Sequence, residues 1–193
     1  MTNFVAYGTT DHSGRVFVAA SDHPSSSVQS YAFAPLLSEV LWSESRSLSN
    51  FFLRGPESPQ IAALAADESG GVFAYGDWYR NYFLSELRGD NTGAQVLWTD
   101  WIDARYENAA AIARAPNGDI FGVGTTFTLP KYPWISVLKY SPSTGEVTNY
   151  DRLTLFDGYI SIARDAVCDA AGNLIIVGQE SEDSRTLYGA GRR

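Results

Sequence analysis

One segment of ten residues occurs four times along this chain and aligns without a gap. Most copies have a turn of the form Asp-x-x-Gly, and all continue into five or six mostly apolar residues. The copies cover residues 11–20, 67–76, 115–124 and 169–178. Their shared glycines, Gly14, Gly70, Gly118 and Gly172, are 56, 48 and 54 residues apart. A recurrence of about 50 residues is typical of folds that stack one supersecondary unit repeatedly.

Each copy predicts a β-hairpin. The aspartate caps the backbone of a tight turn, the glycine accepts a positive φ, and the Val-, Ile- and Phe-rich run is typical of a buried strand. The strand before the turn lies at residues 5–10, 61–66, 109–114 and 162–167, and three of these copies are rich in alanine. Alanine favours helix, but these segments are short and run directly into a turn. We therefore predict strands, whose small residues suit a crowded place near a central axis.

Two further strands complete each unit. Third strands are predicted at residues 28–33, 82–87 and 135–140, and fourth strands at 39–42, 95–98 and 146–149. Four strands in about 50 residues are typical of one propeller blade. We predict an all-β fold in which residues 1–193 form a single β-propeller domain of about four blades of four antiparallel strands. The blades span approximately residues 3–50, 58–103, 107–155 and 159–193.

Two of these segments resemble a known group of proteins. Asp169-Ala-Ala-Gly-Asn-Leu-Ile-Ile-Val-Gly178 and Ile135-Ser-Val-Leu-Lys-Tyr-Ser-Pro-Ser-Thr-Gly145 resemble bacterial β-propeller repeats of the SBBP type. The resemblance extends over nearly the whole chain. It implies a propeller and says little about function, since such propellers serve many roles. One departure is Ala115, which stands where the other units have the capping aspartate.

The fourth unit is predicted to be incomplete. It has its first two strands and a short third around residues 185–188, and no fourth strand follows. End blades must bury their faces and protect their edges. Three arrangements remain open: a compact four-bladed ring with one short blade, a homodimer in which two chains complete a larger ring, and a piece of a longer propeller.

The amino-acid composition limits the classes of partner that we expect. Net charge is −8, without clustered Lys or Arg, so we expect no nucleic-acid partner. Cys168 is the one cysteine and lies in an apolar run, where a buried, inert thiol is expected. It is distant in sequence from His12 and His23, so we expect no metal and no cofactor. Neither a signal peptide nor an apolar run of about 18 residues is present. We therefore expect a cytoplasmic protein that does not engage membranes.

The candidate ligand site lies in loops. In a propeller, the loops joining second to third strands and those joining successive blades gather on one face around the axis. Here those loops include residues 77–81, 100–108 and 125–134. Aromatic rings beside a few polar groups suit a carbohydrate or a protein partner. The candidate ligand-binding residues are Trp78, Tyr79, Arg80, Arg105, Tyr132 and Trp134. Alternatively, these rings cover the core between blades.

Three functions are compatible with this pattern. The leading hypothesis is a non-catalytic binding propeller that uses the aromatic loops. The second is an enzyme, a hydrolase or lyase, in which two carboxylates at the axial pocket perform acid–base chemistry. Its candidate acids are Asp100, Asp103, Asp151 and Asp157, although charged loop residues are commonly just solvated. The third is a structural or assembly module.

Overall fold

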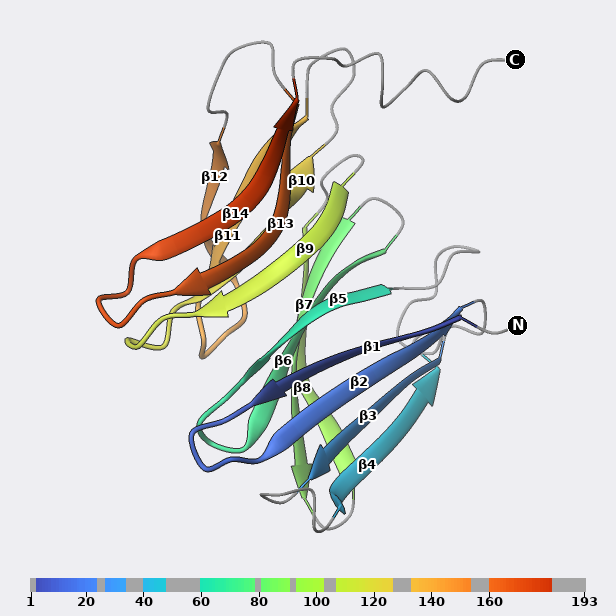
Figure 1. Ribbon diagram of the computed structural model, residues 1–193. Helices are drawn as coiled ribbons and strands as arrows, with labels where there is room; N and C mark the ends of the chain where they lie inside the picture. Colours follow the sequence, from blue (N-terminus) through green and yellow to red (C-terminus); the bar gives the residue numbers. More distant parts are fainter. Residues whose placement is uncertain are drawn as a thin grey trace, which may run out of the picture.

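The computed structural model describes residues 3–23, 27–33, 40–47, 60–78, 81–90, 93–102, 107–126, 133–153 and 160–181. In these residues every regular element is a β-strand (Figure 1). The all-β prediction is therefore confirmed for the described part, including the Ala-rich segments that favour helix by composition. No helix long and apolar enough to cross a membrane occurs in the same residues.

The described strands form four antiparallel sheets, which we call blades one to four in chain order. Blade one contains β1 (Asn3–Thr10), β2 (Val16–His23), β3 (Ser27–Phe33) and β4 (Val40–Ser47). Blade two contains β5 (Gln60–Ala66), β6 (Gly71–Trp78), β7 (Asn81–Asp90) and β8 (Gly93–Ile102). Blade three contains β9 (Glu107–Arg114), β10 (Ile120–Thr126), β11 (Trp134–Tyr140) and β12 (Val147–Leu153). Blade four contains β13 (Ile160–Cys168) and β14 (Leu174–Ser181), and its predicted third strand lies outside the described residues.

The blades follow one another in an open arc. The first strand of each blade is innermost, and β1 packs against β5, β5 against β9, and β9 against β13 (Figure 1). Within the described residues, β13 and β1 make no comparable contact, so the sheets do not close into a ring. The architecture is propeller-like, with blade four and blade one at the two ends of the arc.

The turns between innermost and second strands match the prediction. The side chain of Asp11 accepts hydrogen bonds from the backbone N–H groups of Ser13 and Arg15, both at 2.9 Å. Asp169 repeats this pattern, and the four turn glycines have φ between 80° and 95°. In unit three, the side-chain oxygen of Asn117 accepts from the N–H of Asp119 at 3.1 Å. The turn thus keeps a side-chain cap although Ala115 replaces the aspartate.

In blades two to four, the innermost strand has a β-bulge opposite a glycine of the second strand. The extra residues are Ala62 in β5, Ala110 in β9 and Arg164 in β13, each beside a pair that contains Gly76, Gly124 or Gly178. A Cβ atom at Gly124 would lie 2.6 Å from the carbonyl oxygen of Asn108, and one at Gly178 would lie 2.5 Å from that of Ile162. Blade one has Ala20 at this position, and its β1–β2 register has no shift. Glycine and bulge therefore occur together.

The core lies between the blades. Alternate residues of each second strand face the next blade, as Phe73 and Tyr75 do when they pack with Ile120, Leu138 and Tyr140 of blade three. The intervening residues face the preceding blade: Val72 packs with Phe17, and Ile176 with Val123. Each second strand of an inner blade is thus buried on both faces, which accounts for its continuous apolar run.

A buried hydrogen bond joins successive blades. The hydroxyl of Thr125, at the end of β10, accepts from the backbone N–H of Ala163 in β13 at 3.0 Å. At the equivalent position of blade two, a carboxylate oxygen of Asp77 accepts from the N–H of Ala109 in β9 at 3.1 Å. This interblade hydrogen bond ties the second strand of one blade to the innermost strand of the next.

Replacing Thr125 with valine is expected to lower the free energy of unfolding by about 1–2 kcal/mol, because the buried N–H of Ala163 loses its acceptor. Urea denaturation measures the change. The control is Thr125→Ser, which keeps the hydroxyl and should retain most of the stability. Loss of stability in Thr125→Ser without loss in Thr125→Val would show that the methyl group, not the hydrogen bond, stabilises this contact.

Candidate functional site

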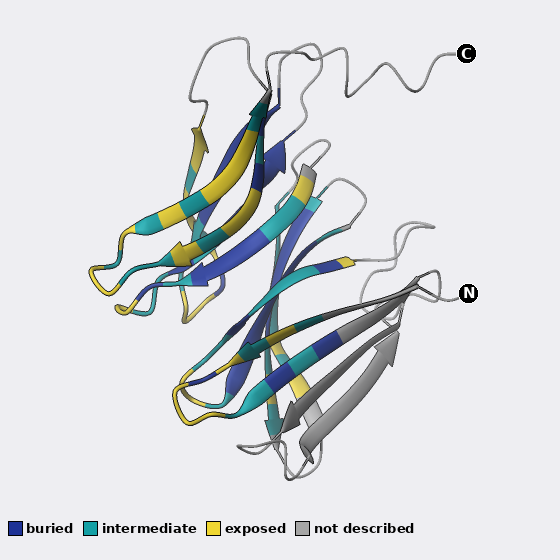
Figure 2. Ribbon diagram, viewed as in Figure 1, coloured by how far each residue is buried: buried dark blue, intermediate teal, exposed yellow. Residues whose placement is uncertain are grey.

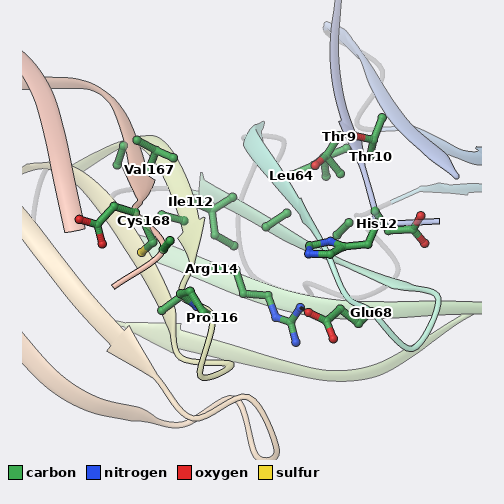
Figure 3. Close-up of a pocket in the computed structure, with 18 residues that line it drawn as sticks. Thr9, Thr10, His12, Leu64, Glu68, Ile112, Arg114, Pro116, Val167 and Cys168 are labelled. Carbon is green, nitrogen blue, oxygen red and sulfur yellow. Dashed lines mark ion pairs between the residues drawn. The ribbon is translucent and has the colours of Figure 1, made fainter. Parts of the chain in front are cut away.

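A cavity of about 660 Å³ lies at the ends of the four innermost strands, where the hairpin turns begin. Blade one contributes residues 9–12 to one side, and blade four contributes residues 166–170 to the other. Residues 64–66 and 68 of blade two and residues 112–116 of blade three line the part between them. Figure 3 shows Thr9, Thr10 and His12 across this axial cavity from Val167 and Cys168. The repeat thus places four equivalent turn segments around one space.

The charged residues that line the axial cavity are Asp11, Glu68, Arg114 and Asp169, one from each blade, and those of blades two and three form an ion pair. Arg114, the last residue of β9, forms an ion pair with Glu68 at 3.3 Å (Figure 3). A second ion pair joins it to Asp67 at 3.6 Å. Its Nε atom is buried and has no hydrogen-bond partner among the described residues. Arg114 is partly buried, whereas Glu68 is exposed. A guanidinium and a carboxylate therefore lie together at the wall, one able to donate hydrogen bonds and the other to accept them.

The remaining wall is a mixture of apolar and small polar groups. Leu64, Ile112 and Val167 supply apolar surface, and the threonines of β1 supply hydroxyls. Small-molecule sites commonly combine a mostly apolar lining with a few polar groups that fix orientation. No group of three or more His, Cys, Asp or Glu side chains that could hold a metal ion occurs in the described residues.

Cys168 also lines the axial cavity. It is a free, half-buried cysteine, so the expectation of a fully buried thiol was wrong. Burial raises the pKa of this thiol, and the negative charges of Asp169 and Asp119 raise it further. Because the thiolate is the nucleophilic form, a raised pKa makes Cys168 a weak nucleophile at neutral pH.

Asp77 is an acid that the sequence analysis placed merely at the start of a loop. Burial raises the pKa of its carboxyl from 3.8 to about 6, although the hydrogen bond from Ala109 opposes this. Its charge also raises the pKa of Tyr7 on β1, after the larger effect of burial. A perturbed carboxylate can mark an acid–base site. Here Thr125 makes the same interblade bond without an acid, which favours a structural role. The available sequence signal was the shared position of Asp77 and Thr125, each directly after a glycine.

The predicted aromatic site is only partly described. Trp78 and Trp134 were expected in loops; instead they occupy strand ends, where they pair with Asn81 and Thr126. Trp134 is 9% exposed, and the guanidinium of Arg152 lies over its ring at 4.8 Å. Its indole N–H is buried without a hydrogen-bond partner in the described part of the chain. This ring is therefore covered by a side chain of its own blade. The side chain of Trp78 lies outside the described residues, as do Tyr79, Arg80, Arg105 and Tyr132.

The axial cavity and these aromatic residues lie at opposite ends of the strands. The cavity adjoins the turns that begin β6 and β10, whereas Trp78 ends β6 and Trp134 pairs with the end of β10. The structure therefore brings together the turn segments of four blades, and it does not bring Trp134 to this cavity. Sequence analysis used these turns to define the repeat and did not consider them as ligand contacts.

The candidate acids also differ from their expected places. Asp100 lies in β8 and Asp151 in β12, so both belong to outermost strands rather than to loops at the axis. Burial raises the pKa of Asp100, and the charge of Glu146 adds to the increase. Asp103 and Asp157 lie outside the described residues. Of the four acids, the two described ones are therefore distant from the axial cavity in strand order, at the opposite edge of each sheet.

No protein-family model matches the chain, and no curated protein matches it in sequence. Among solved structures, the chain is similar to a bifunctional GH43-CE protein of Bacteroides eggerthii, with a TM-score of 0.55 and 13% sequence identity. The match covers 90% of this chain and 22% of that one, so this chain spans less than a quarter of that protein. The likeness supports a β-propeller-like fold. The resemblance to SBBP-type repeats has no support from a family match.

Proposed function

We propose that this protein is a non-catalytic binding propeller that holds a carbohydrate in its axial cavity. The observation that carries the proposal is the ion pair between Arg114 and Glu68 at the wall of the cavity, beside the apolar side chains of Leu64 and Ile112. Sugars present hydroxyls around a ring whose C–H faces are apolar. Such a ligand matches a wall that offers hydrogen-bond donors, acceptors and apolar surface together.

Two further observations support this choice. The volume of about 660 Å³ falls in the range of about 300–1,000 Å³ that small-molecule sites occupy. The similar structure from Bacteroides eggerthii is named as a GH43 protein, which marks a glycoside hydrolase. A carbohydrate is therefore the ligand class to test first. The site proposed here is at the turn end of the strands, away from the aromatic residues that the sequence favoured.

The proposal predicts that Arg114→Ala weakens binding of an oligosaccharide by about tenfold, a loss of about 1.4 kcal/mol. A glycan array followed by calorimetric titration would identify the sugar and measure the change. The matched control is Arg88→Ala, because Arg88 also pairs with Asp67 but lies outside the axial cavity. Circular dichroism would verify that both variants fold.

Several outcomes would contradict the proposal. Absence of binding across the array would exclude a carbohydrate as the ligand. Equal binding by Arg114→Ala and the wild type would exclude the axial cavity as the binding site. Loss of binding in Trp78→Ala, without loss in Arg114→Ala, would move the site to the predicted aromatic face. Release of reducing sugar during the titration would replace the binding module with an enzyme.

A further inference from the structure

We propose that the outer face of blade four binds blade one of a second copy of this chain, and that two copies joined in this way close one ring. The face in question comprises Val167 of β13 together with Ile175 and Val177 of β14. We call it the open forward face, because each blade's forward face looks toward the next blade in the chain. The proposal concerns assembly and does not depend on the proposed ligand.

Comparison with the other blades indicates what the open forward face contacts. In blades one to three, the equivalent residues of the second strand pack on the next blade: Phe17 is 1% exposed, Phe73 2% and Tyr75 0%. Ile175 occupies the position of the two phenylalanines and Val177 that of Tyr75, yet they are 48% and 61% exposed. Figure 2 shows exposed residues along β14, whereas the second strands of blades two and three, β6 and β10, are mostly buried. Among the described residues, the same face of blade four is therefore left exposed.

Val167 completes the comparison on the innermost strand. It is 58% exposed, whereas Ala65 and Ala113, at the same position of blades two and three, are 8% and 4% exposed. Gln179 of blade four stands where Asp77 and Thr125 make the interblade hydrogen bond. Its side-chain oxygen accepts from Arg164 of the same blade at 3.3 Å, in an exposed setting. Blade four therefore carries both the apolar residues and the polar acceptor of a forward face.

Blade one carries the complementary back face. In the other blades, back-face residues of the second strand receive the preceding blade, as Gly122 receives the ring of Tyr75 and Ile176 receives Val123. Val16 and Val18 occupy these back-face positions in blade one and are half-buried. A contact of Val177 with Val18 would match the contact of Val123 with Ile176 in size and chemistry. Both halves of one more interblade interface are thus present in a single chain.

A second copy fits better than closure within one chain. The axial cavity separates residues 166–170 of blade four from residues 9–12 of blade one, at opposite ends of the arc (Figures 1 and 3). Two arcs joined end to end supply eight blades, within the range of about 4–8 that is common for propellers. A head-to-tail contact that repeats once and closes gives a ring with two identical interfaces.

Light scattering coupled to gel filtration tests the proposal on the whole chain. We expect the wild type to have twice the 21.1 kDa chain mass, and Val177→Lys to have the mass of one chain at the same concentration. The matched control is Leu97→Lys, which changes another exposed apolar residue, on β8 of blade two, and should leave the pair intact. A monomeric wild type, a paired Val177→Lys variant, or a mass above two chains would overturn the proposal.

Complementation tests the head-to-tail geometry. Val18→Lys alters the back face of blade one and should also be monomeric alone. Each variant keeps one intact face, so an equimolar mixture of Val18→Lys and Val177→Lys should recover a species of two chains through one intact interface. Failure of the mixture to associate would overturn the head-to-tail contact. Pairing by Val18→Lys alone would show that blade four binds blade four instead.

Discussion

Replacing Gly76 with alanine adds a single methyl group and is expected to lower the free energy of unfolding by about 3 kcal/mol. The added Cβ would overlap the backbone carbonyl oxygen of Gln60 and lie 2.7 Å from the ring of Phe83. A ring at the surface could turn away, but Phe83 is 3% exposed and the carbonyl is held by the bulged strand β5. Either the bulge or the core must therefore move.

Urea denaturation of Gly76→Ala measures this effect, with Gly8→Ala as the control. Gly8 is also a glycine within a strand, but a Cβ there would meet only the carbonyl oxygen of Phe17, at 3.6 Å. That distance is ordinary contact, so the control should change stability by less than about 0.5 kcal/mol. Similar losses in the two variants would mean that the bulge does not require glycine.

Replacing Asp77 with asparagine is expected to stabilise the protein at neutral pH by about 2–3 kcal/mol. The pKa of the carboxyl rises from 3.8 to about 6 because it is buried, and each pKa unit corresponds to about 1.4 kcal/mol. Between these two values the folded protein binds more protons than the unfolded chain. Stability is therefore lost as the pH rises from about 4 to about 6, and the penalty stays constant above that range. Asparagine cannot ionise, yet its side-chain oxygen can still accept the bond from Ala109.

The measurement is the free energy of unfolding of the wild type and of Asp77→Asn between about pH 4 and pH 8. The two proteins should have similar stability at the acidic end and diverge as the pH rises. The reciprocal variant, Thr125→Asp, puts a carboxyl at the equivalent buried position of the next blade and should add a second loss over the same range. Parallel curves for the wild type and Asp77→Asn would show that Asp77 is not the titrating group.

Much of the fold was predictable because its signals are local. A tight turn with a glycine, of the form Asp-x-x-Gly in three of the four units, specifies a hairpin within about 20 residues when an apolar run follows, and four such hairpins appear where expected. The outer strands were harder to delimit. β8 and β12 extend to Ile102 and Leu153, several residues past the predicted ends of the fourth strands at residues 98 and 149. Polar residues interrupt the apolar pattern before each strand ends, at 99–100 in β8 and 151–152 in β12. Asp100 and Asp151 were therefore wrongly placed in loops.

The candidate site was less predictable because it depends on several blades at once. Arg114 and Glu68 lie in different repeat units, and neither has a neighbour in sequence that suggests their ion pair. Burial of Asp77 likewise arises from packing between blades, not from the residues beside it. The aromatic residues were chosen as candidates because their rings are large. A large ring can pack in a core as readily as it can contact a ligand. Trp134 shows this, since its ring is covered by Arg152.

The sequence by itself determined the repeating hairpin, its turn chemistry and the four-stranded unit, because these follow from backbone preferences and from side chains close together in the chain. Only the tertiary structure decided which faces the blades cover and where the arc remains open. The apolar run of β14 looks the same in sequence as those of β6 and β10. Whether such a run is buried depends on a neighbouring blade, and the free energy of burial is gained only where that neighbour is present. Val177 is exposed and Tyr75 is buried for this reason.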